Sequence, residues 1–138
     1  MKIKKILFLW LPVVVWSAVI FTLSSIKTLP TQEIYWWDFV LKKTAHVVEY
    51  AILYFLVFRA INKADCRLKE GLAYDIKIGK TTLRPQDWLI PFVLTLFYAF
   101  SDEYHQSFVP GRHCKLMDIG FDSLGMVLSF WQIKKHLA

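Results

Sequence analysis

The sequence predicts an all-α membrane protein, a four-transmembrane-helix bundle with both termini in the cytoplasm. Three observations favour this fold class. Of the 138 residues 56% are hydrophobic, and the mean hydropathy is +0.39, which is more apolar side chain than a soluble domain of this length can bury. The apolar residues gather in four long runs. Basic residues flank these runs, where they set the orientation of a membrane protein.

The first predicted span, residues 6–23, has no charged residue. Its length is close to the roughly 20 residues that cross the hydrocarbon core as a helix. A signal peptide is the alternative interpretation, because the run follows a basic start. We favour a retained helix, since the run is long for a signal peptide and no Ala-x-Ala site follows it.

The other predicted spans are residues 44–61, 88–106 and 116–133, and together they make a single membrane domain over residues 1–138. The third span begins with an apolar run of only about 20 Å, so its helix has to continue through the polar residues that end it. The connector before the second span carries Trp36 and Trp37, which are typical of a membrane interface or a short in-plane helix. Residues 62–87 are too charged for lipid, and their 74–83 part alternates as in a short hairpin.

The distribution of basic residues gives the orientation. Twelve of the 17 lysines and arginines lie on the side of the termini and of the 62–87 loop, which predicts that this side is cytoplasmic. Cys66 and Cys114 then lie on opposite sides of the membrane, where they cannot form a disulfide within one chain. The charge of +6 is not arranged as a basic stripe, so we expect lipid and not nucleic acid as a partner.

This topology places most of the unusual polar residues at the extracytoplasmic ends of the helices. Ionisable residues at membrane depth indicate a functional site or a paired one. The candidate catalytic residues are His46, Asp102 and His105. The candidate ligand-binding residues are Lys43, His46, Glu49, Tyr50, Asp102, Glu103, Gln106, Arg112, Asp118 and Asp122.

Helical spacing supports this grouping. Lys43, His46 and Tyr50 share one helix face, and Asp118 and Asp122 share another with the small residues Gly125 and Ser129. Asp122 lies a full turn into its span, so we expect it to have Lys43 or Arg112 as a neighbour or to have a raised pKa.

Structural alternatives exist for several of these residues. Lys43 and Arg112 also suit anchors at the headgroups, and Asp118 suits a helix N-cap. His46 and Glu49 can form a structural pair. Arg59, at the opposite end, is typical of a snorkelling anchor.

Two motifs carry a family resemblance. Lys43-x2-His46-x3-Tyr50-x2-Leu53 resembles the second-helix motif of the VanZ-like family, and Asp102-Glu103-x2-Gln106-x-Phe108-x-Pro110-Gly111-Arg112 is similar to its third-to-fourth-helix signature. The match spans roughly residues 6–129, with departures in the long 62–87 loop and at residues 113–114. The resemblance implies a multi-pass protein of the bacterial cytoplasmic membrane, in the cell envelope, associated with tolerance of glycopeptide antibiotics such as teicoplanin. It implies no established reaction and no cofactor.

Three functional hypotheses follow. In the first, the extracytoplasmic residues bind an anionic lipid, a lipid-linked cell-wall precursor or a glycopeptide, with Lys43, His46 and Arg112 holding phosphate. In the second, an intramembrane enzyme acts on a lipid phosphate, with His46 or His105 as base or nucleophile, although no nucleophile motif is present. In the third, the polar residues fix helix packing and function lies in contacts with another membrane protein.

No metal is predicted, because metal-ligand spacings such as Cys-x2-Cys are missing from the sequence. A metal-dependent variant of the enzyme hypothesis would use His46, Glu49, Asp102 and His105 as ligands. The sequence leaves the oligomeric state open, and a transport path would require an oligomer.

Overall fold

The chain forms four helices and one short hairpin in the computed structural model, which describes residues 2–26, 36–64, 76–78, 81–110 and 116–137. The helices are α1 (Lys2–Ser24), α2 (Trp36–Ala64), α3 (Pro85–Gln106) and α4 (Leu116–Leu137). The antiparallel hairpin pairs β1 (Ile76–Ile78) with β2 (Thr81–Leu83). The predicted all-helical fold with four helices is confirmed, and so is the short hairpin before the third helix.

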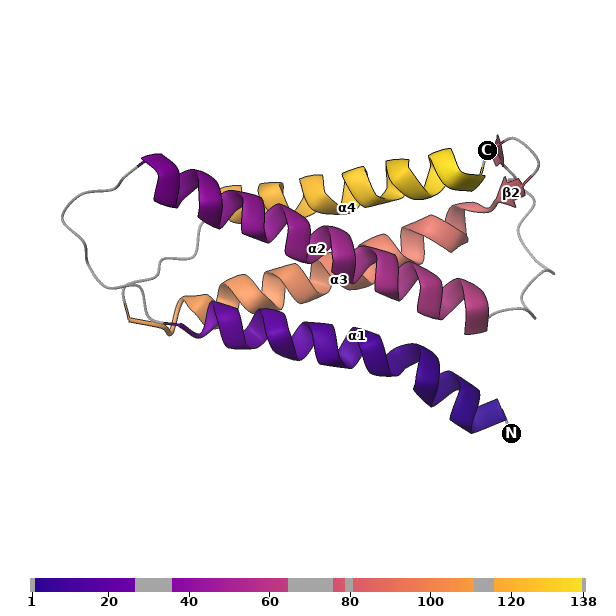
Figure 1. Ribbon diagram of the computed structural model, residues 1–138, viewed down its shortest axis with the longest axis horizontal. Helices are drawn as coiled ribbons and strands as arrows, with labels where there is room; N and C mark the ends of the chain where they lie inside the picture. Colours follow the sequence, from indigo (N-terminus) through magenta and orange to yellow (C-terminus); the bar gives the residue numbers. More distant parts are fainter. Residues whose placement is uncertain (1, 27–35, 65–75, 79–80, 111–115, 138) are drawn as a thin grey trace.

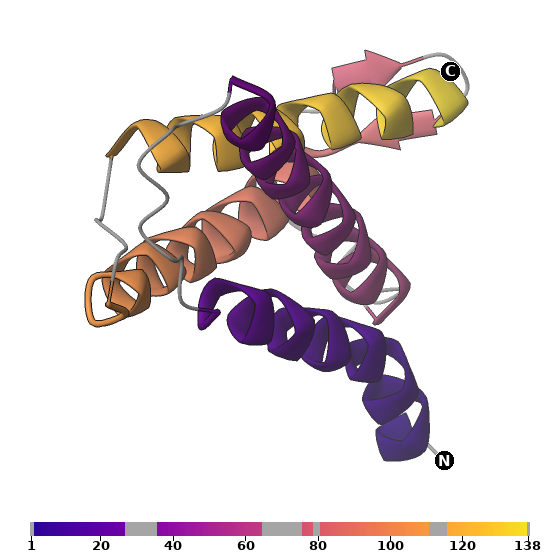
Figure 2. The same ribbon diagram turned by 60° about the vertical axis from the view of Figure 1, so that its left-hand side comes forward.

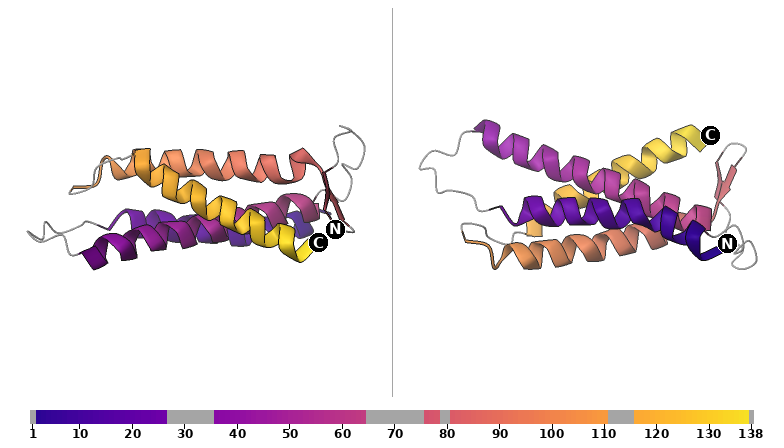
Figure 3. Two further views of the ribbon diagram at one scale, coloured as in Figure 1. Left: turned by 90° about the horizontal axis from the view of Figure 1, so that it is seen from above. Right: turned by 60° about the horizontal axis from the view of Figure 1, so that its bottom comes forward.

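All four helices run along the long axis of the molecule (Figure 1). We call the end at which α1 and α3 finish and α2 and α4 begin the distal end. At the opposite end, the terminal end, α1 begins, α4 ends and the hairpin lies beside the last turns of α4 (Figure 3). The start of α1 and the end of α4 therefore lie at the same end of the bundle.

The second helix holds the bundle together. It contacts the other three helices and packs most extensively against α4, which it crosses in the first half of both helices (Figure 2). It begins at Trp36, well before the predicted residue 44, because residues 36–43 contain no glycine or proline that would interrupt a helix. The exposed Trp36 and Trp37 therefore open α2 and do not form a separate in-plane helix.

The third helix has a well-defined start. Arg84 is extended, Pro85 occupies the first helical position, and the Asp87 carboxylate accepts a hydrogen bond from the Arg84 backbone N–H at 2.8 Å. A proline at the first position and an acidic residue at the third both favour a helix start. From there α3 continues to Gln106, so the polar residues at its end are helical.

Apolar side chains lie on the surface of the bundle as well as in its core, and several polar side chains are buried. Long apolar side chains on the outer faces of α3 and α4 are exposed: Leu89, Ile90, Val93, Leu94, Phe97, Phe100, Leu124, Val127, Leu128 and Trp131. Several polar side chains are buried instead: Ser24, Thr95, Asp102, Glu103, Gln106, Asp122 and Ser129. Extended apolar surface of this kind indicates contact with an apolar phase or a partner.

Candidate functional site

Asp102, near the end of α3, is the centre of a buried hydrogen-bonding arrangement. Its side chain is 3% exposed. Its Oδ2 accepts hydrogen bonds from Ser24 Oγ at 2.8 Å, from Gln106 Nε2 at 2.9 Å and from the Tyr50 hydroxyl at 3.3 Å. Because Ser24 ends α1 and Tyr50 lies on α2, this one carboxylate joins three helices at the distal end.

The fourth helix joins through two charged contacts with α2. His46 Nδ1 lies 3.1 Å from Asp122 Oδ1, and Lys43 forms an ion pair with Asp118. The two contacts lie one turn apart because both pairs follow helical spacing. Asp122, which is 1% exposed, therefore has His46 as its partner. Lys43, one of the alternatives expected for Asp122, lies one turn nearer the start of α2 and pairs with Asp118 instead.

We give the name distal network to two neighbouring groups of buried or half-buried side chains: the group around Asp102, with Ser24, Tyr50 and Gln106, and the pair of His46 and Asp122. Asp102 Oδ1 and Asp122 Oδ2 are buried, and neither has a hydrogen-bond partner within the described part of the chain. Buried polar atoms are nearly always hydrogen-bonded, and a carboxylate accepts on both oxygens. The distal network therefore has two buried oxygens whose capacity to accept hydrogen bonds is unused within the described residues.

Gly125 brings α4 close enough to α2 for these contacts to form. A Cβ atom at this position would lie 2.2 Å from the Val47 carbonyl oxygen and 3.1 Å from the Ala51 backbone nitrogen. Only a residue without a side chain permits such close approach of two helices. Gly125 lies one turn from Asp122, and Val47 adjoins His46, so this close contact of α2 with α4 lies next to the buried His46–Asp122 pair.

Lys43 is part of the bundle and not a free headgroup anchor. Its side chain is 17% exposed. Besides the ion pair with Asp118, its ammonium group lies 5.6 Å from the Phe39 ring centre and 5.5 Å from that of Phe121, distances at which a cation is attracted to the face of an aromatic ring. Asp118 is the third residue of α4, so it lies inside the helix and is not its N-cap.

His105 lies on the other side of Asp102, next to the end of α1. Its Nε2 is 3.1 Å from Ser25 Oγ, and its ring lies 4.3 Å from that of Phe21, centre to centre. The Ser25 hydroxyl donates its single proton to the Phe21 carbonyl oxygen at 2.7 Å. His105 is therefore the donor in its contact with Ser25, because a hydroxyl has only one proton to give.

Three more predicted site residues are Glu49, Glu103 and Arg112, and the structure describes only the first two. Glu103 is buried and Glu49 is half-buried, whereas Arg112 lies outside the described residues. Ser24, which the sequence places at the extracytoplasmic end of the first span, was not among the candidate ligand-binding residues, although it is a main partner of Asp102. The signal for it in the sequence is a serine directly after a long apolar run.

Within the described part of the chain, no group of three or more His, Cys, Asp or Glu side chains is placed to hold a metal ion. His46 and Asp102, two of the ligands in the metal-dependent hypothesis, instead form the contacts with Asp122 and with Ser24 described above. The geometry gives that hypothesis no support.

Within the residues that the structure describes, two helices are long and apolar enough to cross a membrane, α1 over Ile6–Ser24 and α2 over Phe39–Asn62. The sequence model of the VanZ/LLP1 family matches residues 3–136, which is nearly the whole chain. The chain belongs to the VanZ/LLP1 family. The resemblance in the two motifs is thereby confirmed, and family membership together with the apolar helices supports a membrane protein. No curated protein and no solved structure matches this VanZ/LLP1 chain.

Proposed function

We propose that this VanZ/LLP1 protein is a multi-pass protein of the bacterial cytoplasmic membrane in which all four helices span the bilayer and both termini are cytoplasmic. The exposed apolar faces of α3 and α4 and the buried polar interior support this proposal. The start of α1 and the end of α4 lie at the same end of the bundle (Figure 1), as four spans require. The excess of basic residues at that end supports a cytoplasmic location.

We further propose that the distal end faces the cell exterior and binds a lipid-linked cell-wall precursor or another anionic lipid, and so contributes to teicoplanin-type tolerance. The observation that carries this proposal is the pair of buried carboxylate oxygens in the distal network, Asp102 Oδ1 and Asp122 Oδ2, which have no described partner. A ligand whose hydroxyl groups donate to these two oxygens would complete the network.

The charges at the distal end favour a sugar phosphate over a bare phosphate. Lys43 is already paired with Asp118, and Asp122 with His46, so an isolated anion gains little there and is repelled by Asp102. A sugar phosphate has several hydroxyl donors for the two buried carboxylate oxygens, which a bare phosphate dianion lacks. Arg112, which follows α3 in the sequence, adds a guanidinium that can bind phosphate through two parallel hydrogen bonds.

The test is Asp102→Asn in a bacterial host that depends on the protein for teicoplanin tolerance. Asparagine keeps one oxygen to accept from Ser24 and Tyr50, but replaces the unpartnered oxygen by an amide donor. We expect the minimal inhibitory concentration of teicoplanin to fall to that of the empty vector while the amount of protein in the membrane stays unchanged. Arg112→Ala should give the same result.

The matched control is Asp87→Asn, the same chemical change at the opposite end of α3. There the remaining side-chain oxygen can still accept from the Arg84 backbone N–H, so tolerance should be retained. Full tolerance in Asp102→Asn at normal protein abundance would rule out ligand binding by the distal network. A fall in abundance with tolerance lost only in proportion would assign these residues to helix packing instead.

One observation favours a second candidate, hydrolysis of a lipid phosphate or cell-wall lipid: the contact of 3.1 Å between Ser25 Oγ and His105 Nε2. In the present geometry the serine proton is directed to Phe21, so the serine would have to turn before His105 could act as its base. Purified protein that releases phosphate from a polyprenyl phosphate, and loses this activity in His105→Ala or His46→Ala, would establish the enzyme.

A further inference from the structure

A proline interrupts the backbone hydrogen bonds of α3 between its start and the distal network. Pro91, the seventh residue of this helix, is fully buried. Because proline has no backbone N–H, the carbonyl group of Asp87, four residues earlier, loses the donor that an α-helix would supply. The hydroxyl of Thr95 also donates to the Pro91 carbonyl oxygen at 2.8 Å, and such a contact often bends a helix. The backbone of α3 alone therefore constrains its direction poorly at this turn.

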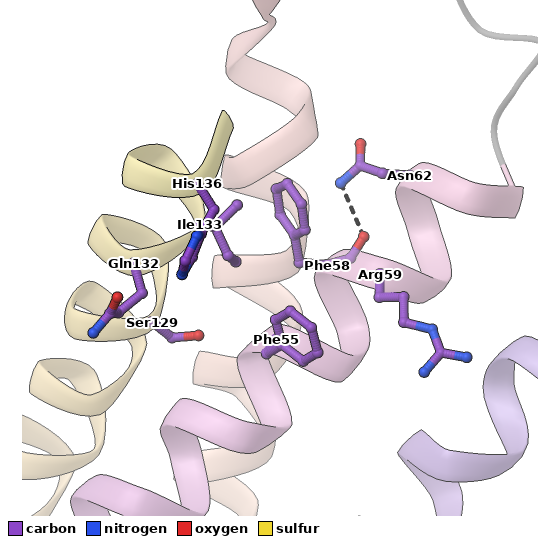
Figure 4. A pocket seen from close by; sticks show the side chains of 8 residues that line it. All are labelled: Phe55, Phe58, Arg59, Asn62, Ser129, Gln132, Ile133 and His136. Carbon is purple, nitrogen blue, oxygen red and sulfur yellow. Dashed lines mark hydrogen bonds between the residues drawn. The ribbon is translucent and has the colours of Figure 1, made fainter. Parts of the chain in front are cut away.

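Side chains of α2 replace the hydrogen bonding that the proline removes. The Asn62 amide, which has two N–H groups, donates to the Phe58 carbonyl oxygen at 2.9 Å within α2 (Figure 4) and to the Asp87 carbonyl oxygen at 3.0 Å. The Tyr54 hydroxyl donates to the next carbonyl oxygen of α3, that of Trp88, at 3.2 Å. Neighbouring helices commonly satisfy the backbone groups that a proline frees in a membrane helix. Two donors from α2 thus hold the turn at which α3 lacks a bond of its own.

The direction of α3 at this turn decides where Asp102 lies. Asp102 is 11 residues beyond Pro91, which is about 16 Å along a helix. Over that length a change in direction of about 3° displaces Asp102 by about 0.8 Å, which is enough to lengthen its 2.8 Å bond with Ser24 beyond the limit of about 3.5 Å. Sharp helix kinks at prolines exceed about 20°. The contacts of Asp102 in the distal network therefore require the direction of α3 to be fixed closely.

We propose that Asn62 and Tyr54 are positioning residues for the distal network. Their hydrogen bonds to two successive carbonyl groups fix the direction in which α3 continues beyond Pro91, and so place Asp102 opposite Ser24. Neither residue touches the distal network itself; both act through α3. That the placed residues bind a ligand rests on the proposed function, whereas the placement itself does not.

The test measures the distance between the distal ends of α2 and α3 by pulsed electron paramagnetic resonance, on the full chain in lipid nanodiscs. Nitroxide labels are attached at two exposed positions, through Trp37→Cys and Tyr104→Cys, in a background in which Cys66 and Cys114 are replaced by serine. Asn62→Leu keeps the side-chain volume but removes both donor groups. We expect this variant to shift or broaden the distance distribution by about 3 Å, the displacement that a pivot of about 10° produces.

A second substitution separates positioning from a general loss of packing. In Pro91→Ala the new N–H can donate to the Asp87 carbonyl oxygen, so adding Asn62→Leu to this variant should cause no further change in the distance. Gln132→Leu is the matched control, because it also replaces an amide by leucine, on an exposed side chain of α4, and it should give the wild-type distance. Should Asn62→Leu not fold, as judged by circular dichroism, Tyr54→Phe takes its place and should give a smaller change.

An unchanged distance in Asn62→Leu would overturn the proposal. An equal effect of Asn62→Leu with and without Pro91→Ala would also overturn it, since the Asp87 carbonyl group would then play no part. Teicoplanin tolerance is measured in the same variants. A changed distance with full tolerance would support the positioning role and refute the distal network as the source of tolerance, whereas lost tolerance at an unchanged distance would refute the positioning role alone.

Discussion

The close contact at Gly125 makes a quantitative prediction possible. In Gly125→Ala the new Cβ would lie 2.2 Å from the Val47 carbonyl oxygen, whereas ordinary van der Waals contact begins at 3.4 Å. The opposing atoms belong to the backbone of α2, so a side-chain rotation cannot relieve the clash. We expect the two helices to separate by roughly 1 Å, since packed helices cannot be compressed.

This separation also affects the distal network. The His46–Asp122 distance of 3.1 Å would then exceed about 3.5 Å, beyond which a hydrogen bond is lost. Overpacking costs about 1–3 kcal/mol, and loss of a hydrogen bond to a charged group costs about 1.5–3 kcal/mol. The free energy of unfolding should therefore fall by about 3–5 kcal/mol.

The assay is unfolding in mixed detergent micelles, followed by the helical circular dichroism signal. Gly120→Ala is the matched control, because a Cβ atom at Gly120 in the same helix meets nothing within 4 Å. That variant should gain about 0.5–1 kcal/mol, since alanine suits a helix better than glycine. If Gly125→Ala is as stable as Gly120→Ala, the close contact of α2 with α4 does not exist.

Three more predictions concern the network and the orientation. His46→Leu leaves Asp122 buried without its partner and should lower the unfolding free energy by about 3–5 kcal/mol. The double variant with Asp122→Leu added should recover part of this loss. If the same unfolding assay shows no recovery, His46 and Asp122 are not paired. Ser24→Ala removes one donor to a buried carboxylate and should cost about 1–3 kcal/mol, and a cost near zero would show that the bond contributes nothing. A membrane-impermeant maleimide should label Cys114 in intact cells but Cys66 only after permeabilisation, and the reverse pattern would contradict the orientation.

Much of the fold could be predicted from residue patterns because each pattern acts locally. Four apolar runs predicted four helices, and alternation before the third predicted the hairpin. The start of α2 was placed too late because the prediction began at the first apolar run, whereas a helix continues through any residues that do not break it. Trp36 and Lys43 are such residues.

The candidate site was harder, since partners depend on how far each helix extends past its neighbour. The faces carrying His46 and Asp122 were predictable from spacing, but the register that pairs His46 with Asp122 and Lys43 with Asp118 was not. That register follows from the Gly125 contact, which one sequence does not reveal.

The separation in sequence between the partners of the buried pairs has a consequence for biosynthesis. Lys43 and Asp118 are 75 residues apart, and His46 and Asp122 are 76 apart. At a synthesis rate of about 5–20 residues per second, the acidic partners leave the ribosome about 4–15 s after the basic ones. In the proposed membrane topology, α2 enters the bilayer during that interval, before Asp118 and Asp122 can pair with its lysine and histidine. Insertion of α2 would therefore precede the formation of the Lys43–Asp118 and His46–Asp122 contacts. The four helices can pack together only after α4 has been synthesised.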